Sequence, residues 1–155
     1  MLSEFEQAEQ YYNQWQSTGA TSFDRSNNYQ IGYVYHKLGK TVEAEQIFAE
    51  KIQQLESELA NKQRNVFGVL PYNELIDLSR IHASQGNKKQ ALKYLTEYAR
   101  RGFRNGWHDF IVIDPFFESL RDDPEFKAIV KQAQEEKAAL RAQVREMEER
   151  GELTL

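Results

Sequence analysis

Histidines and carboxylates are the side chains of this chain whose types could do chemistry. His36, His82 and His108 are the candidate metal ligands, yet no His-x3-His or HExxH spacing occurs, and such spacing places two histidines on one helix face. The carboxylates that could serve a hydrolase as acid and base are Asp109, Asp114, Glu118, Asp122 and Asp123. Their spacing is typical of helix caps and of a solvated helix face. We therefore expect neither a metal site nor general acid–base catalysis.

Cysteine and glycine-rich motifs give no catalytic signal either. The chain has no cysteine, which excludes thiolate nucleophiles, disulfides and cysteine-rich zinc sites. The phosphate-binding patterns GxGxxG and GxxxxGK and the nucleophile pattern GxSxG do not occur. The sequence predicts a protein that is not an enzyme and binds no cofactor. A hydrolase that uses the acidic loop is kept as a remote alternative.

Length and composition favour one folded domain over residues 1–155. The formal charge of −4 disfavours nucleic acid, because binding to phosphates relies on clustered Lys and Arg. No apolar run approaches the roughly 20 residues of a membrane span, and the first ten residues lack the layout of a signal peptide. We expect a cytoplasmic protein whose partner is a protein or peptide, not nucleic acid or a membrane.

Apolar residues at spacings of three and four predict five helices before residue 106. Gly39, Gly86 and Gly102 are expected to end helices, since glycine accepts the left-handed backbone found there. Thr41 is expected to cap the third helix, and Pro71 to open the fourth. The five predicted ranges are 3–17, 26–38, 41–62, 71–86 and 88–101.

Two pairs of these helices repeat one pattern of residue types. The first pair reads Ile31-Gly32-x2-Tyr35-x3-Gly39-x4-Ala44-x3-Phe48. The second pair reads Leu78-Ser79-x2-His82-x3-Gly86-x4-Ala91-x3-Leu95. Internal repeats are strong indicators of fold. The pattern resembles the tetratricopeptide repeat, in which a small residue and an alanine let two antiparallel helices approach, aromatic rings fill the gap, and a glycine makes the turn.

The resemblance implies an all-α, right-handed antiparallel helical repeat of about seven helices. Its repeat-like units would span about 26–62 and 71–102. The second unit departs from the family pattern at Ser79, His82 and Leu95. The turn glycines are also 47 residues apart (39 to 86), compared with the family's period of about 34, so we expect an insertion of about 13 residues in the third helix and its loop.

A capping segment over 106–126 and a long final helix over 124–150 follow the repeats. Asp114-Pro115 and Asp123-Pro124 each pair a good N-cap with a good first helical residue, so each predicts a helix start. The apolar underside expected to cover the last repeat consists of Phe110, Ile111, Ile113, Phe117, Leu120 and Phe126. This segment resembles the one that closes degenerate tetratricopeptide repeats in bacterial sensor kinases, nucleotide cyclases and transcription regulators, where it implies a C-terminal interaction or regulatory module.

The final helix carries apolar residues at spacings of three and four, interrupted by Lys137. Its far half is expected to fold back along the domain or to pair with another chain, giving a monomer or a weak homodimer. Folding back is preferred, because only about two heptads remain beyond Ala133. The alternative function is an assembly domain that dimerises its parent protein through this helix.

The preferred function is a non-catalytic protein-interaction module, and the family resemblance implies a peptide groove along the first helix of each pair. The residues predicted to line it are Tyr29, Tyr33, His36, Lys37, Asn73, Ile76, Arg80 and Ser84. Such a surface suits an extended peptide whose carboxylate meets Lys37 or Arg80. The alternative is that the additional helices fill the groove.

Overall fold

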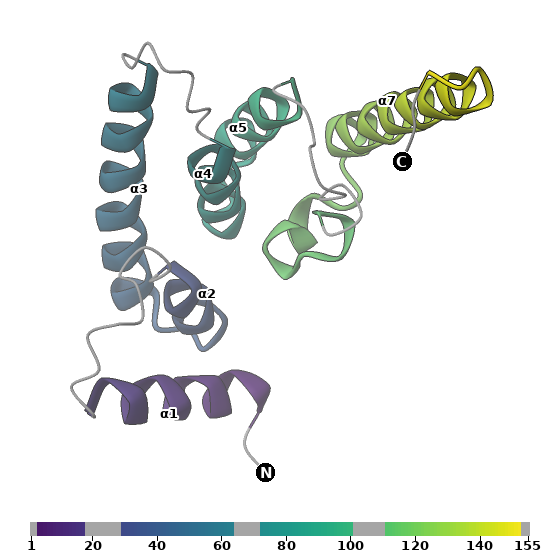
Figure 1. Cartoon of the computed structure of the whole chain (residues 1–155). Helices are drawn as coiled ribbons and strands as arrows, with labels where there is room; N and C mark the ends of the chain where they lie inside the picture. The colour runs from purple at the N-terminus through teal and green to yellow at the C-terminus, as the bar shows by residue number, and fades with distance from the viewer. Residues whose placement is uncertain (1–2, 18–28, 64–71, 101–110, 153–155) are drawn as a thin grey trace.

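The computed structural model describes residues 3–17, 29–63, 72–100 and 111–152, and within these ranges every regular element is helical. The prediction of an all-α fold is confirmed for this part of the chain. The elements with defined bounds in these ranges are the α-helices α1 (Glu4–Ser17), α2 (Tyr29–Lys37), α3 (Thr41–Gln63), α4 (Tyr72–Ser84), α5 (Lys88–Arg100) and α7 (Pro124–Glu149), together with η2 (Pro115–Leu120), which is a 3₁₀-helix. Figure 1 shows α1 beside α2, the long α3 along one side, and α4, α5 and η2 between α3 and α7.

The helices α2 and α3, and likewise α4 and α5, form two hairpins with the same turn. Gly39 and Gly86 have φ values of 76° and 72°, a region that glycine occupies without steric cost. The Lys40 N–H donates to the Tyr35 carbonyl oxygen at 2.9 Å, and the equivalent bond after Gly86 measures 2.8 Å. Both predicted helix stops are confirmed, because each glycine lets the chain satisfy carbonyls that the helix end leaves open.

Small residues bring the two helices of each hairpin close together. A Cβ atom on Gly32 would lie 2.8 Å from the ring of Phe48, so a larger residue would collide there. Ala44 and Phe48 are fully buried, as is Ala91 in the second hairpin. There the Ser79 hydroxyl donates to the Ala91 carbonyl oxygen at 2.8 Å, which satisfies a buried polar group. In both hairpins, therefore, the two helices meet closely at a small residue of the first helix and a buried alanine of the second.

The core consists of two adjoining clusters of buried side chains. One joins the first hairpin to α4 through Tyr29, Tyr33, Ala44, Phe48, Leu55, Leu78 and Ile81. The other joins α4 and α5 to the closing segment through Leu75, Leu92, Leu95, Ile111, Phe117, Leu120, Phe126 and Ile129. The second hairpin thus packs on both sides, which fixes the position of η2 relative to α4.

The two Asp-Pro steps begin helices as predicted. Asp114 accepts a hydrogen bond from the backbone N–H of Phe116 at 3.0 Å, and Pro115 is the first residue of η2. Asp123 accepts from the N–H groups of Glu125 and Phe126 at 2.8 and 3.3 Å and caps α7. The first of these helices is a short 3₁₀-helix that ends at Leu120.

The apolar underside of the closing segment is correct except at one position. Phe117, Leu120 and Phe126 are buried, and so is Ile111, but Ile113 is 69 % exposed. Residues 111–113 are helical, and side chains two positions apart in a helix point about 200° away from each other around its axis. Burial of Ile111 therefore turns Ile113 outward. Phe110 lies outside the described residues.

The prediction that the final helix folds back is wrong. Phe126, Ile129 and Ala133 are buried, whereas Leu140 and Val144 are 62 % and 45 % exposed. No glycine or proline interrupts the chain between Pro124 and the end of α7, so the helix continues straight past the core. Figure 1 shows the far half of α7 leaving the other helices.

Some helix starts differ from prediction or cannot be compared. Thr41 is the first residue of α3, and its hydroxyl donates to the Gly39 carbonyl oxygen instead of capping the helix. Residues 26–28, Pro71 and residues 101–102, which hold other predicted helix boundaries, lie outside the described residues. In the described ranges no helix combines the length and apolar character needed to cross a membrane.

Candidate functional site

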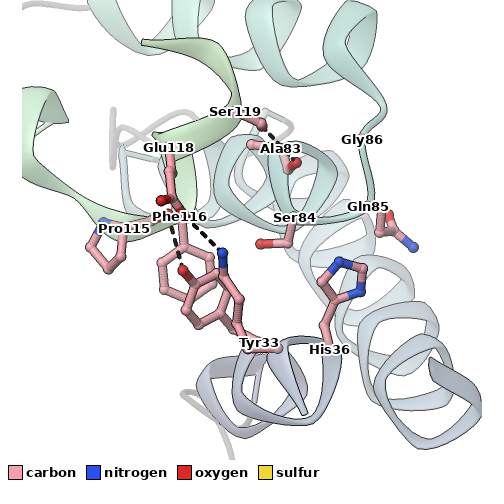
Figure 2. Close-up of a pocket in the computed structure, with 11 residues that line it drawn as sticks. Tyr33, His36, Ala83, Ser84, Gln85, Gly86, Pro115, Phe116, Glu118 and Ser119 are labelled. Carbon is pink, nitrogen blue, oxygen red and sulfur yellow. Dashed lines mark hydrogen bonds and ion pairs between the residues drawn. The ribbon is translucent and has the colours of Figure 1, made fainter. Parts of the chain in front are cut away.

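Two hollows lie where η2 meets the predicted groove face of α2 and α4. The first, of about 420 Å³, is lined by Tyr33, His36, Lys37, Ala83, Ser84, Gln85, Gly86, Pro115, Phe116, Glu118 and Ser119. The second, of about 600 Å³, is lined by Tyr29, Gln30, Arg80, Ile113, Asp114, Pro115 and Phe116. Pro115 and Phe116 form the wall between the two, so one ligand chain could cross both. Figure 2 shows the first hollow, with Tyr33 and His36 on α2 facing Ser84 on α4 and Glu118 on η2.

The structure brings most of the predicted groove residues to these hollows. Tyr33, His36, Lys37 and Ser84 line the first, and Tyr29 and Arg80 line the second. Ile76 is instead buried in the core with α5 and the closing segment. Asn73 belongs to the first turn of α4, and its side chain lies outside the described part of the structure.

The centre of the predicted groove is occupied by η2. The Phe116 ring lies 4.5 Å from the Tyr33 ring and 5.5 Å from the Tyr29 ring, measured between centroids. The Tyr33 hydroxyl donates to the Pro115 carbonyl oxygen at 3.2 Å. The alternative prediction, that additional helices fill the groove, therefore applies to its centre. The space open to a ligand is the pair of hollows on either side of Phe116.

Arg80 sits in a largely buried charge network. Its Nε atom is 2.8 Å from Asp114 Oδ2, and its Nη1 atom is 3.1 Å from Asp77 Oδ1. The Tyr29 hydroxyl also donates to Asp77, at 2.7 Å. Burial raises the pKa of Tyr29, as does the charge of Asp77, so this hydroxyl stays protonated and remains a donor. With two carboxylates already bound, Arg80 is committed to the fold and is a poor partner for a ligand carboxylate.

Lys37 is held much more loosely than Arg80. Its ammonium is 2.7 Å from Glu118 Oε2, and both side chains reach solvent. The hydrogen bond between them raises the pKa of Lys37 and lowers the pKa of Glu118, so both stay charged near neutral pH. An exposed ion pair contributes little to stability because water screens it. A ligand carboxylate could therefore replace Glu118 at small cost.

Polar groups beside Lys37 complete the first hollow. The His36 Nδ1 atom is buried and has no hydrogen-bond partner among the described residues. The Ser84 hydroxyl donates to the Arg80 carbonyl oxygen at 3.0 Å, so its oxygen can still accept a bond. His36, Lys37 and Ser84 are thus the side chains through which this hollow can bind a polar group, and Lys37 is the cation that can bind an anionic one.

The carboxylates and histidines outside the hollows have structural roles. Asp123 caps α7 and pairs with Lys88, and this hydrogen bond to Lys88 lowers the pKa of Asp123. The His82 ring stacks on Tyr94 with centroids 5.6 Å apart, and burial lowers the pKa of His82. Within the described ranges no three His, Asp or Glu side chains gather so as to hold a metal ion. Asp109 and His108 lie outside those ranges.

Sequence reasoning missed the contribution of the closing segment to this site. Phe116 and Phe117 are neighbours, and adjacent residues of a helical turn point in different directions. Phe117 is fully buried in the core, which leaves Phe116 to pack elsewhere, on Tyr29 and Tyr33. Two adjacent phenylalanines were the feature of the sequence that could have indicated a second contact surface on this segment. No comparable signal marked Gln30 or Gln85.

Comparison with protein-family models, with curated proteins and with solved structures found no match for this chain. The assignment of a function therefore rests on the geometry of the two hollows and of the helices around them.

Proposed function

We propose that this chain is a non-catalytic module that binds a protein or peptide, built as a right-handed tetratricopeptide-like repeat. Its role would be regulatory, as in the bacterial multidomain proteins whose closing segment it resembles. Two features support the repeat assignment: both hairpins turn at a glycine with positive φ, and both bury an alanine at the equivalent close contact.

The observation that carries the proposal is the larger hollow, whose apolar wall is open to solvent. Ile113 is 69 % exposed at its edge, and the rings of Tyr29 and Phe116 form its inner side. An exposed apolar side chain next to a cavity is a common mark of a binding site, because a ligand that covers it removes apolar surface from water. The backbone of an extended peptide that crosses Pro115 would then bring its next side chains to Lys37.

This geometry suits a ligand with two kinds of side chain. One apolar side chain fills the hollow beside Ile113, and an acidic side chain a few residues away replaces Glu118 at Lys37. Arg80 makes no direct contact with the ligand, because Asp77 and Asp114 already occupy its guanidinium group.

Selection from a random peptide library displayed on phage tests the proposal. Peptides selected on the wild-type protein should share an apolar residue followed or preceded by an acidic one. Ile113→Asp should weaken their binding at least about tenfold, because it places a charge in the apolar wall. Val42→Asp is the matched control, since Val42 is 80 % exposed on α3, away from both hollows.

Each variant must fold normally before its affinity is compared with that of the wild type. Equal affinity of the selected peptides for the wild type and for a normally folded Ile113→Asp variant would rule out this hollow as the site. Lys37→Glu should separately reverse the preference for acidic residues while leaving the apolar preference intact, because the two hollows bind different side chains.

A hydrolase of the acidic loop receives no support from the geometry. Asp114 is bound to Arg80, and Glu118 pairs with Lys37. The hydrogen bond from Lys37 lowers the pKa of Glu118, whereas a general acid that must stay protonated near neutral pH needs a raised one. The assembly alternative rests on α7, whose exposed face is a separate feature of the molecule.

A further inference from the structure

The far half of α7 carries an apolar stripe that nothing in the described structure covers. We define the distal stripe as Leu140, Val144 and Met147; Leu140 and Val144 are 62 % and 45 % exposed. The stripe continues the spacing of the buried half in alternate steps of four and three, through Phe126, Val130, Ala133, Lys137, Leu140, Val144 and Met147. This is the spacing of the seam residues of a coiled coil.

The distal stripe lies on the same face of α7 that packs against α5. A strict seven-residue repeat drifts only about 20° per heptad on a straight helix, so Leu140 points almost in the direction of Ala133. Ala133 is buried and lines a small hollow together with Arg100, the last residue of α5. The distal stripe therefore begins where α5 ends, like the seam of a two-helix pair whose second helix stops halfway.

We infer that the distal stripe is an antiparallel self-association surface, and that a second copy of α7 continues the seam beyond α5. A parallel partner in register would have to place its own residues 126–133 in the space that α5 fills. An antiparallel partner avoids this collision, because its buried half and its core lie beyond the C-terminal end of the first helix.

The distribution of charge along α7 favours the same orientation. Residues 137–145 contain Lys137, Arg141 and Arg145 and no acidic residue. Residues 146–152 contain four glutamates and one arginine. On the seam, a parallel pair would place Lys137 of one helix against Lys137 of the other, whereas an antiparallel pair brings Lys137 of each helix to the acidic end of its partner.

The seam spacing fixes the register of the pair. Leu140 of one copy faces Val144 of the second copy. By symmetry, Val144 of the first copy faces Leu140 of the second. Lys137 then lies over Met147 of the second copy, with its ammonium beside Glu148 of that copy. Glu136 meets Arg150 of the second copy at each edge. The dimer thus has only two purely apolar seam contacts, so the interface is small and the dimer weak.

Sedimentation equilibrium of the intact chain tests the association. The wild-type mass should rise toward that of a dimer as the concentration approaches about 1 mM, in keeping with so small an interface. Leu140→Asp should stay at the monomer mass throughout this range. Val42→Asp, the same type of change on the exposed surface of α3, should follow the wild type. A wild-type protein that stays monomeric, or a Leu140→Asp variant that still dimerises, overturns the inference.

Disulfide trapping tests the relative orientation of the two α7 helices. The chain has no cysteine of its own, so the introduced cysteines are the only ones that can form a disulfide. Leu140→Cys mixed with Val144→Cys should form a disulfide between the two variants under mild oxidation. A parallel pair would instead link Leu140→Cys to itself. Efficient homodimer formation by Leu140→Cys alone, with no mixed product, would therefore overturn the antiparallel arrangement. Circular dichroism confirms that each variant keeps its helices, which is expected because these positions are exposed.

Discussion

At the scale of single residues, the charges of this protein divide into those that hold the fold together and those that face solvent. Arg80 belongs to the first group, with a side chain only 17 % exposed and two carboxylates within hydrogen-bond distance. Lys37 belongs to the second. Arg80 and Lys37 could not be distinguished in the sequence, because Arg80 is buried by a segment that lies more than thirty residues away along the chain.

Arg80→Leu is predicted to lower the free energy of unfolding by about 3–5 kcal/mol, because it leaves the largely buried carboxylates of Asp77 and Asp114 without their cation. Lys37→Leu removes an exposed pair and should change stability little. Urea denaturation of the two variants measures the difference. A loss of similar size in both would show that the network around Arg80 is not the stronger one.

The pH dependence of stability should report on His82. Burial lowers the pKa of His82 in the folded protein, whereas the unfolded chain keeps a value near 6.5. Between these two values the unfolded chain binds more protons, so the contribution of His82 is complete above about pH 6.5 and is lost as the pH falls toward the folded pKa. His82→Tyr keeps a ring beside Tyr94 without this titration. Its melting temperature should therefore fall less than that of the wild type between about pH 7.5 and 5.5.

At the scale of elements, the parts that the sequence predicted well are those set by local chemistry. The stops at Gly39 and Gly86 and the starts after Asp114 and Asp123 depend on residues within one helical turn. The placement of the elements was harder to predict. The direction of Ile113 depends on residues 111–113 being helical, and the extension of α7 depends on contacts with distant parts of the chain, which bury Ala133 but leave Leu140 exposed.

The close contact within each hairpin gives an element-scale prediction. Ala44→Leu and Ala91→Leu should each cost about 1–3 kcal/mol, because both alanines are fully buried where two helices meet. Ala49→Leu is the control, since Ala49 lies on the exposed face of α3. Thermal unfolding of the three variants distinguishes them. Unchanged melting temperatures for both buried positions would remove the basis of the repeat assignment.

Truncation separates the two halves of the closing region. A chain that ends at Glu136 should keep the melting temperature of the full protein, because the side chains that α7 buries lie at or before Ala133. A chain that ends at residue 106 loses Phe117, Leu120 and Phe126 and should aggregate, because α4 and α5 then expose their apolar side. A soluble fragment 1–106 with a cooperative melting transition would contradict this expectation.

At the scale of the whole molecule, η2 connects parts of the chain that a simple repeat array would keep separate. In such an array each unit touches only its neighbours, so the end units can open while the rest stays folded. Here the Tyr33 hydroxyl binds the Pro115 carbonyl oxygen, across 82 positions of sequence. The first hairpin therefore cannot open without releasing the segment that closes the second.

This connection predicts a single unfolding event for the described core. Amide hydrogen exchange in α2 and in α5 should show similar opening free energies, in contrast to the gradient toward the ends that is expected of independent repeats. Clearly faster exchange in α2 would mean that η2 does not couple the two hairpins. Phe116→Ala should uncouple them and let α2 exchange faster than α5, because it removes the ring that packs against Tyr29 and Tyr33.

The same contact sets an order for folding during synthesis. The ribosome makes the chain from its N-terminus, so the first hairpin emerges long before Phe116 does. Until then the Tyr29 and Tyr33 rings lack the partner that covers them in the finished protein. The nascent first hairpin thus carries an exposed aromatic face for about the time needed to add 80 residues, at rates of about 5–20 residues per second. Chaperones that bind apolar surfaces would meet the chain during this interval, several seconds before its fold can close.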